Sequence, residues 1–178
     1  MSKLNGVEIK AIKTFKGHEG ETCYQGNLYL NGKRLGFWSQ DSWSGMDIFD
    51  FDESTLNKVC EDYQAGFDDD YRYKAVCAEK EVFISAVLRL RLIEKDLTPG
   101  FKKSYKAAIY VTDGFHCNWT WLPDNGTDEA LLKKYSANVE IMKEDMFKNE
   151  IPRIAVFRPG EFDITIDKNH PAPEIFQS

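Results

Sequence analysis

The alternation of hydrophobic and polar residues predicts strands in the first part of the chain. Residues 7–11 alternate, in a strand that can extend to Phe15. Residues 23–30 and 33–40 flank Asn31-Gly32, a dipeptide typical of a two-residue hairpin turn. In such a hairpin residue 30 faces 33 and residue 28 faces 35, which assigns every side chain to one face. The predicted core face holds Tyr24, Leu28, Leu30, Leu35 and Phe37, and the outer face holds Gln25, Asn27, Tyr29, Arg34 and Trp38.

Apolar residues at helical spacing predict two main helices. The first follows Asp52, its expected N-cap, and repeats apolar residues at i, i+3, i+4 and i+7 as far as Tyr63. The second covers residues 79–97, where a wide apolar face is typical of a helix packed on a sheet. Pro99-Gly100 is expected to end it, because proline and glycine are both unfavourable in a helix interior.

The second helix carries another apolar stripe on nearly the opposite side. Ile84, Leu88 and Leu92 recur at i, i+4 and i+8. A helix that is apolar on two sides is usually covered on both. The cover comes either from another part of this chain or from a second copy, and we favour a homodimer with these three residues in its interface.

The remaining pattern completes an α+β fold, with an antiparallel sheet built from β-hairpins and the two main helices packed on it. A second hairpin is expected around Asp113-Gly114, and a short helix after Thr127, whereas the pattern of residues 139–150 fits a strand or a helix equally. We predict a single domain over residues 1–167 and an extended C-terminal tail over 168–178. Further short strands are expected at 48–51, 154–157 and 162–166.

The charge of the chain is concentrated in one stretch. The formal net charge is −6, yet residues 41–70 contain ten acidic residues and one basic residue. Residues 1–40 have an excess of three basic residues, and residues 71–178 are balanced. Because nucleic-acid affinity depends largely on Lys and Arg that neutralise phosphates, the overall charge argues against direct binding of nucleic acid.

Several functional classes have no support in the sequence. No apolar run is long enough to cross a membrane, and no apolar segment follows the N-terminal Lys3 as in a secretory signal, so a cytoplasmic protein is expected. The four cysteines include no C-x-x-C pair that would indicate a zinc or redox site. We expect no cofactor and no bound metal.

The acidic stretch is the best candidate for a functional surface. We expect a non-enzymatic interaction protein that uses residues 41–70 to bind a basic partner, with Trp38 and Trp43 as aromatic contacts. By analogy, such a face can imitate nucleic acid or mask a phosphate-binding groove, as inhibitors in mobile elements do. The acidic residues assigned to this surface are Asp41, Asp47, Asp50, Asp68, Asp69 and Asp70.

An enzymatic alternative uses the same carboxylates. Clustered hard oxygen ligands near residues 41–53 could hold Mg²⁺ or Mn²⁺ in a metal-dependent hydrolase. The sequence offers little else for catalysis. His116 and Cys117 are adjacent, so on a strand they point to opposite faces and cannot form a nucleophile pair. Cys117 shares its face with two tryptophans, and we expect a buried, inert thiol there.

Overall fold

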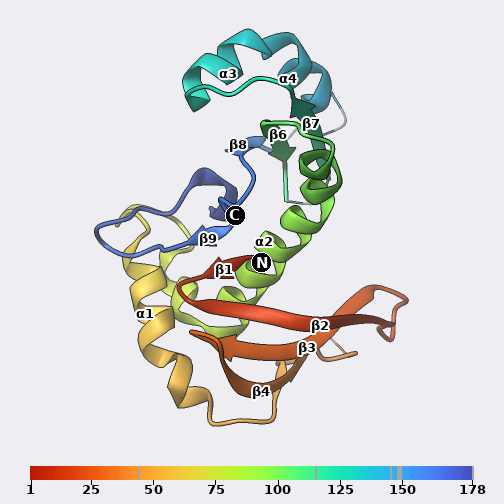
Figure 1. Ribbon diagram of the computed structural model, residues 1–178. Coiled ribbons are helices and arrows are strands. Elements are labelled where there is room, and N and C mark those ends of the chain that lie inside the picture. The colour runs from red at the N-terminus through yellow and green to blue at the C-terminus, as the bar shows by residue number, and fades with distance from the viewer. Residues whose placement is uncertain (44, 115, 145, 148–149, 178) are drawn as a thin grey trace. The chain divides into compact units, whose positions relative to one another are not determined.

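The computed structural model describes the chain except residues 44, 115, 145, 148–149 and 178 (Figure 1). It confirms the α+β class, with two sheets and four α-helices in the described residues. The chain divides into two compact units, 1–92 with 163–171 and 93–162 with 172–178. The long helix α2 contributes residues to both units, and the C-terminal tail is shared between them.

The first unit is built on a six-stranded sheet with the order β5-β4-β3-β2-β1-β9. All neighbouring strands are antiparallel except β1 and β9. The predicted Asn31-Gly32 turn is confirmed, because Leu30 pairs with Lys33 directly across it. The strands are β1 (Lys3–Leu4), β2 (Val7–Lys16), β3 (Thr22–Leu30), β4 (Lys33–Ser39), β5 (Ile48–Phe49) and β9 (Asp163–Ile164).

A β-bulge in the first hairpin changes which side chains face the core. Tyr29 pairs with Arg34 as predicted, but Leu28 pairs with Gly36 instead of Leu35, so the rest of β4 is shifted by one residue. Because side chains alternate along a strand, a one-residue shift moves all later ones to the other face. Trp38 is therefore fully buried and Phe37 faces outward, the reverse of the prediction.

The first main helix begins as predicted. Asp52 accepts a hydrogen bond from the backbone N–H of Ser54 at the start of η1 (Glu53–Leu56), which continues into α1 (Asn57–Ala65). Gly66 ends α1 with an ordinary negative φ. A Cβ at this position would lie 2.4 Å from Ile166 Cγ2, so Gly66 is required by close packing rather than by a left-handed backbone. After a turn at η2 (Lys74–Ala78), the chain enters α2 (Lys80–Lys102).

Helix α2 continues past Pro99-Gly100, so the predicted end at this point was wrong. The close approach of another side chain explains the glycine, because a Cβ on Gly100 would lie 2.1 Å from the ring of Trp121. The indole Nε1 of Trp121 also donates to the carbonyl of Leu97, at 3.2 Å. Pro99 has no backbone N–H, so the helix lacks one hydrogen-bond donor at this point. The helix nevertheless continues, and its last turns pack against the Trp121 indole.

The second apolar stripe of α2 is covered within the chain. Ile84 is fully buried, Leu88 is 6% exposed and Leu92 is half-buried. From the sequence we favoured a homodimer with Ile84, Leu88 and Leu92 in its interface, and the burial of Ile84 and Leu88 within the single chain does not fit that interface. Ile84 and Leu88 consequently offer no exposed surface on which a second copy could dock.

The second unit packs two helices on one face of a three-stranded antiparallel sheet, with the order β7-β6-β8. The ambiguous region after Val139 continues a helix that begins at Ser136; Asp145, Lys148 and Asn149 of this region lie outside the described residues. The C-terminal tail is not simply extended, since Ile175 and Phe176 are buried in a short 3₁₀ helix. The elements are β6 (Ala107–Thr112), β7 (Cys117–Leu122), α3 (Asp128–Lys134), α4 (Ser136–Lys143), β8 (Arg153–Phe157) and η3 (Glu174–Phe176).

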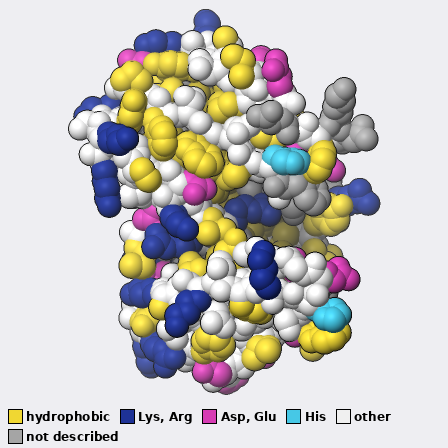
Figure 2. Space-filling view, turned by 90° about the vertical axis from the view of Figure 1, so that its right-hand side faces the viewer, with side chains coloured by type: hydrophobic (Ala, Val, Ile, Leu, Met, Phe, Trp, Pro, Cys, Tyr) yellow, Lys and Arg dark blue, Asp and Glu magenta, His cyan; other side chains and the backbone are white. Residues whose placement is uncertain are grey.

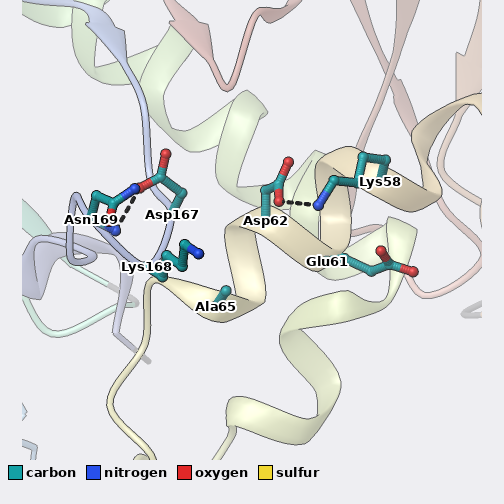
Figure 3. A pocket seen from close by; sticks show the side chains of 7 residues that line it. All are labelled: Lys58, Glu61, Asp62, Ala65, Asp167, Lys168 and Asn169. Atoms are coloured by element: carbon teal, nitrogen blue, oxygen red, sulfur yellow. Dashed lines mark hydrogen bonds and ion pairs between the residues drawn. The ribbon is translucent and has the colours of Figure 1, made fainter.

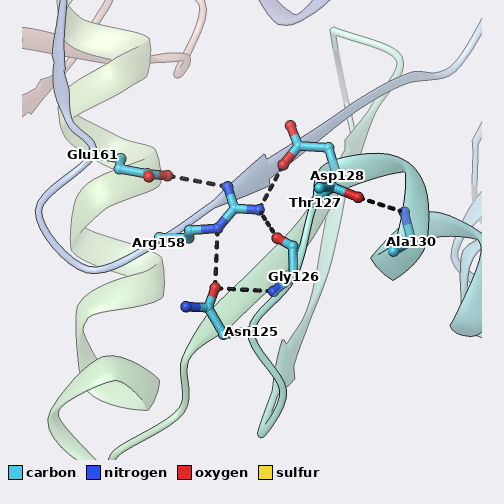
Figure 4. A network of polar contacts seen from close by, with 7 residues as sticks. All are labelled: Asn125, Gly126, Thr127, Asp128, Ala130, Arg158 and Glu161. Atoms are coloured by element: carbon cyan, nitrogen blue, oxygen red, sulfur yellow. Dashed lines mark hydrogen bonds and ion pairs between the residues drawn. The ribbon is translucent and has the colours of Figure 1, made fainter.

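A charged side chain fastens the loop before α3 to the end of β8 (Figure 4). The guanidinium of Arg158 forms ion pairs with Asp128, at 2.7 Å, and with Glu161, at 3.3 Å. It also donates to the carbonyl of Gly126, at 2.5 Å. Thr127 caps α3 beside this network, as its position before an acidic first turn predicts. These contacts give Arg158 a structural role.

The second hairpin has a longer turn than its Asp113-Gly114 signal predicts. Thr112 pairs with Cys117, so the connection covers residues 113–116 instead of two residues; Phe115, the expected first residue of the second strand, lies outside the described residues. The buried carboxylate of Asp113 accepts from the backbone N–H groups of His116, at 2.7 Å, and Phe147, at 2.8 Å. These hydrogen bonds stabilise the wider turn.

Candidate interaction surface

The acidic residues that the sequence assigned to the binding surface lie in two separate places. Asp41, Asp47 and Asp50 lie in the connection after β4 and around β5, at one edge of the six-stranded sheet. Asp68 and Asp70 are exposed in the loop that follows α1. Nine residues of α1, with a rise of about 1.5 Å per residue, carry the chain away from the β4 edge before this loop begins (Figure 1). The two groups are therefore joined along the chain only by the acidic residues of η1 and α1, which are Glu53, Glu61 and Asp62.

Some of these carboxylates are occupied by structural contacts. Asp50 accepts a hydrogen bond from the backbone N–H of Phe37, which covers part of the open edge of β4. Asp52 caps a helix, and the hydrogen bonds from Ser54 lower its pKa. Asp69 pairs with Lys74 at 2.8 Å, and this contact lowers the pKa of Asp69. Each of these carboxylates therefore has a partner within the fold, and for Asp69 that partner is a cation.

Two loops meet at the end of the sheet opposite the Asn31-Gly32 turn. The loop between β2 and β3 contributes His18, and the loop after β4 contributes Ser42 and Trp43. The backbone N–H of His18 donates to the carbonyl of Ser42, at 2.8 Å. The imidazole stacks on the Trp43 indole, with ring centroids 3.7 Å apart and planes 18° apart. A stack of this kind holds the indole at the surface rather than in the core.

The second loop is shaped by Asp41 and presents apolar side chains to solvent. The carboxylate of Asp41 accepts from the backbone N–H groups of Trp43, at 3.2 Å, and Gly45, at 2.8 Å, which folds the loop into a tight turn. Trp43 is 70% exposed, Met46 82% and Ile48 55%. Three large apolar side chains with this exposure within six residues form an apolar tip next to carboxylates, a composition suited to a protein contact.

A group of carboxylates lies behind this tip. Asp47 accepts a hydrogen bond from the indole Nε1 of the buried Trp38, at 2.7 Å. Burial raises the pKa of Asp47, and the nearby carboxylates of Glu81 and Asp41 raise it further, while the hydrogen bond from Trp38 opposes the shift. The sequence suggested that Trp38 contacts a partner. It is instead buried in the fold, where it donates a hydrogen bond to Asp47.

Cys23 lies within the same acidic group. Burial raises the pKa of its thiol, and the carboxylates of Glu21, Asp41 and Asp47 act in the same direction. A thiol in this environment stays protonated and unreactive near neutral pH. We call the residues of these two loops, His18, Glu21, Asp41, Trp43, Met46, Asp47 and Ile48, the acidic loop surface.

Sequence reasoning found only part of this surface. It identified Asp41, Trp43 and Asp47, but it missed His18 as the stacking partner, Glu21, and Glu81 on α2. Gly17 and Gly20 on either side of His18-Glu19 favour a loop, but nothing in the sequence indicates that it meets a loop more than twenty positions away.

The carboxylates do not converge as a metal site requires. Within residues 1–43, 45–114 and the other described ranges, no group of three or more His, Cys, Asp or Glu side chains is placed to hold a metal ion. A Mg²⁺ or Mn²⁺ site needs several oxygens around one point. The geometry therefore gives the metal-dependent hydrolase no support.

The remaining candidates from the sequence, His116 and Cys117, lie in the second hairpin. The imidazole Nδ1 of His116 lies 3.1 Å from the buried carboxylate of Asp113, inside the turn of the second hairpin. Cys117 is exposed at the start of β7, opposite Thr112, so the prediction that it is buried was wrong. A two-residue turn at Asp113-Gly114 would pair Cys117 with Tyr110. The longer turn pairs Tyr110 with Trp119 and leaves Cys117 at the end of the sheet.

A polar hollow of about 420 Å³ lies between α1 and the turn after β9 (Figure 3). Its charges largely balance: Lys58 pairs with Asp62 at 2.5 Å, and the carboxylate of Asp167 accepts from the backbone N–H of Asn169 at 2.7 Å. In Figure 3 the side chain of Glu61 points away from the Asp167 turn. No single charge is presented to a ligand, so the hollow ranks below the acidic loop surface. It is lined by Lys58, Glu61, Asp62, Ala65, Asp167, Lys168 and Asn169.

Comparison with known proteins adds no constraint on this site: no protein-family model, curated protein or solved structure matches the chain. In the described part of the chain, no helix is both long and apolar enough to cross a membrane.

Proposed function

We propose that the protein is a non-enzymatic interaction protein that binds a basic protein partner through the acidic loop surface. The observation that carries this proposal is the Trp43 side chain, which is 70% exposed and held at the surface by its stack on His18. Exposing a tryptophan costs free energy in water unless it is buried in a complex. Tryptophan is also among the residues that contribute most to protein interfaces.

The surrounding charge defines the partner. Asp41 and Asp47 lie behind the apolar tip, and Glu21 and Glu81 add further negative charge nearby. A complementary surface has an apolar pocket for Trp43 and basic residues around it. Asp68 and Asp70 lie beyond the far end of α1, so their role in this proposal is long-range attraction of the partner rather than direct contact.

Site-specific photo-crosslinking in source cells tests the proposal. A photo-reactive amino acid replaces Met46, 82% exposed beside Trp43, and in a matched control replaces Ile151, 83% exposed in the second unit. We expect a discrete adduct with a basic protein from position 46 and none of the same mass from position 151. No adduct at position 46, the same adduct at both positions, or an acidic partner would contradict the proposal.

A further inference from the structure

The face of the six-stranded sheet that points away from the core has an unusual composition. The register of β2, β3 and β4 sets its side chains in rows across the strands. Each row contains a charged residue of β2 and a polar or aromatic residue of β3. The rows are Glu8–Tyr29–Arg34, Lys10–Asn27–Phe37 and Lys13–Gln25–Ser39. We call these nine residues the sheet face.

The contrast between the two faces shows that the sheet face is open. On the core side, Val7, Ile9, Leu28 and Trp38 are at most 1% exposed. On the sheet face only Glu8 and Ser39 are buried, while Lys13 and Arg34 are exposed and the remaining residues are half-buried. Seven of the nine side chains therefore reach solvent.

The charge of the sheet face is positive. Its single acid, Glu8, is neutralised by Lys10, whose Nζ lies 3.0 Å from the carboxylate and 4.2 Å from the centroid of the Tyr29 ring. Arg34 donates to the side-chain carbonyl of Asn27, at 3.0 Å. Among the ion pairs of the described residues, none joins Lys13 or Arg34 to a carboxylate. Figure 2 shows Lys and Arg side chains on the surface in both halves of the view, with Asp and Glu side chains among them.

We propose that the sheet face binds single-stranded nucleic acid. Lys13 and Arg34 meet the phosphates, and the rings of Tyr29 and Phe37 provide stacking surfaces for bases. The amides of Asn27 and Gln25 supply donors and acceptors for base edges. Open sheets with aromatic, amide and basic side chains bind unpaired bases in this way, because these bases can leave their stack and lie on a ring.

The aromatic and amide rows favour this ligand over an acidic protein or a duplex. Phosphates of a duplex, like the carboxylates of an acidic protein, require cations only. Neither ligand explains why two aromatic rings and two amides lie between the cations on an open face. The sheet face shares no residue with the acidic loop surface, although its Ser39 pairs with Ile48 of that surface, and neither proposal depends on the other.

The net charge of −6 argued against binding of nucleic acid. That charge is a sum over residues that the fold places on different surfaces, so it does not describe the sheet face. The acidic excess lies in the loop after β4, on α1 and in the loop that follows it, whereas the sheet face draws on residues 8–39. The two unpaired cations, Lys13 and Arg34, form a narrow site, so weak and salt-dependent binding is expected rather than tight binding.

Fluorescence anisotropy with labelled single-stranded RNA and DNA of about 15 nucleotides tests the proposal. The full chain is expected to bind, and the affinity should fall on the order of tenfold between about 50 and about 200 mM salt, as for roughly two neutralised phosphates. The double variant Lys13→Glu, Arg34→Glu should abolish binding. Tyr29→Leu, which keeps an apolar strand residue and removes the ring, should weaken it about tenfold.

The matched control is Lys102→Glu, Lys103→Glu, which makes the same change in net charge at exposed positions of the second unit. This variant should bind like the wild type, and thermal melts should show that all variants are folded. No binding by the wild type at about 50 mM salt would overturn the proposal. So would an equal loss in the control variant, an unchanged affinity in Tyr29→Leu, or complete competition by polyglutamate at equal charge.

Discussion

At the residue scale, the two tryptophans at and beneath the acidic loop surface have opposite roles. Trp38 is fully buried and donates to Asp47, whereas Trp43 is mostly exposed and stacks on His18. The same residue type, five positions apart, is a core residue in one case and a contact residue in the other. Substitutions at these positions should therefore separate stability from binding.

Trp38→Phe should lower the free energy of unfolding, because it removes the indole N–H from Asp47 and leaves a cavity. We expect a loss of roughly 2–4 kcal/mol, measured by urea unfolding. Trp43→Phe is the matched control, and its stability should stay within about 0.5 kcal/mol of the wild type. A similar loss in both variants would show that Trp43 is part of the core.

Replacing Asp47 with Asn should change the pH dependence of stability. Burial raises the pKa of Asp47 in the folded state. Ionisation of this residue therefore opposes folding once the pH rises above the ordinary aspartate pKa of about 4. Asp47→Asn keeps an acceptor for Trp38 and removes this cost. The stability of the variant relative to wild type should therefore increase between about pH 3 and pH 7, and a difference independent of pH would contradict the assignment.

Cys117 should be the fast thiol of the native protein. It is exposed, whereas Cys23, Cys60 and Cys77 are buried, and burial raises the pKa of Cys60 to about 11. A water-soluble thiol reagent should modify one thiol rapidly in the native state and the other three only in denaturant. The rapid phase should disappear in Cys117→Ser, and a rapid phase that persists in this variant would contradict the placement.

At the element scale, the sequence predicted most elements but not the details that decide which surfaces are exposed. The Asn31-Gly32 turn and the Asp52 cap follow from local chemistry, and both are confirmed. The bulge at Leu35 could not be predicted, because an inserted residue leaves the apolar pattern intact while it reverses the faces of Phe37 and Trp38.

The end of α2 was also unpredictable from local sequence. Pro99 and Gly100 favour termination, but packing of Trp121 against Gly100 depends on a strand twenty residues later. The acidic loop surface has the same origin, since it joins His18 to Trp43 through tertiary contacts. Local signals therefore predicted elements, and non-local packing determined the site.

The covered stripe of α2 makes a prediction at this scale. Leu88→Glu should lower the free energy of unfolding by more than about 3 kcal/mol, because it places a charge at a buried position. Ser85→Glu, at an exposed position of the same helix, should change it by less than about 0.5 kcal/mol. If Leu88→Glu instead stays folded and changes only the sedimentation coefficient, the stripe is an interface between copies.

At the scale of the whole molecule, the first unit presents surfaces of opposite charge. The acidic loop surface and the sheet face both derive from the β2–β4 region, yet they use different residues and different chemistry.

Reversing Asp68 and Asp70 to Lys should slow association with a basic partner at low salt and have little effect at high salt, because distant exposed charges act by steering.

The most direct test of the central claim is a binding titration with the basic protein that crosslinks at position 46. Calorimetry should compare wild type with Trp43→Ala, whose stability is expected to be unchanged. We predict that Trp43→Ala weakens binding by about thirtyfold or more, as for a residue at the centre of an interface. An affinity equal to that of the wild type would contradict the assignment of the acidic loop surface as the binding site.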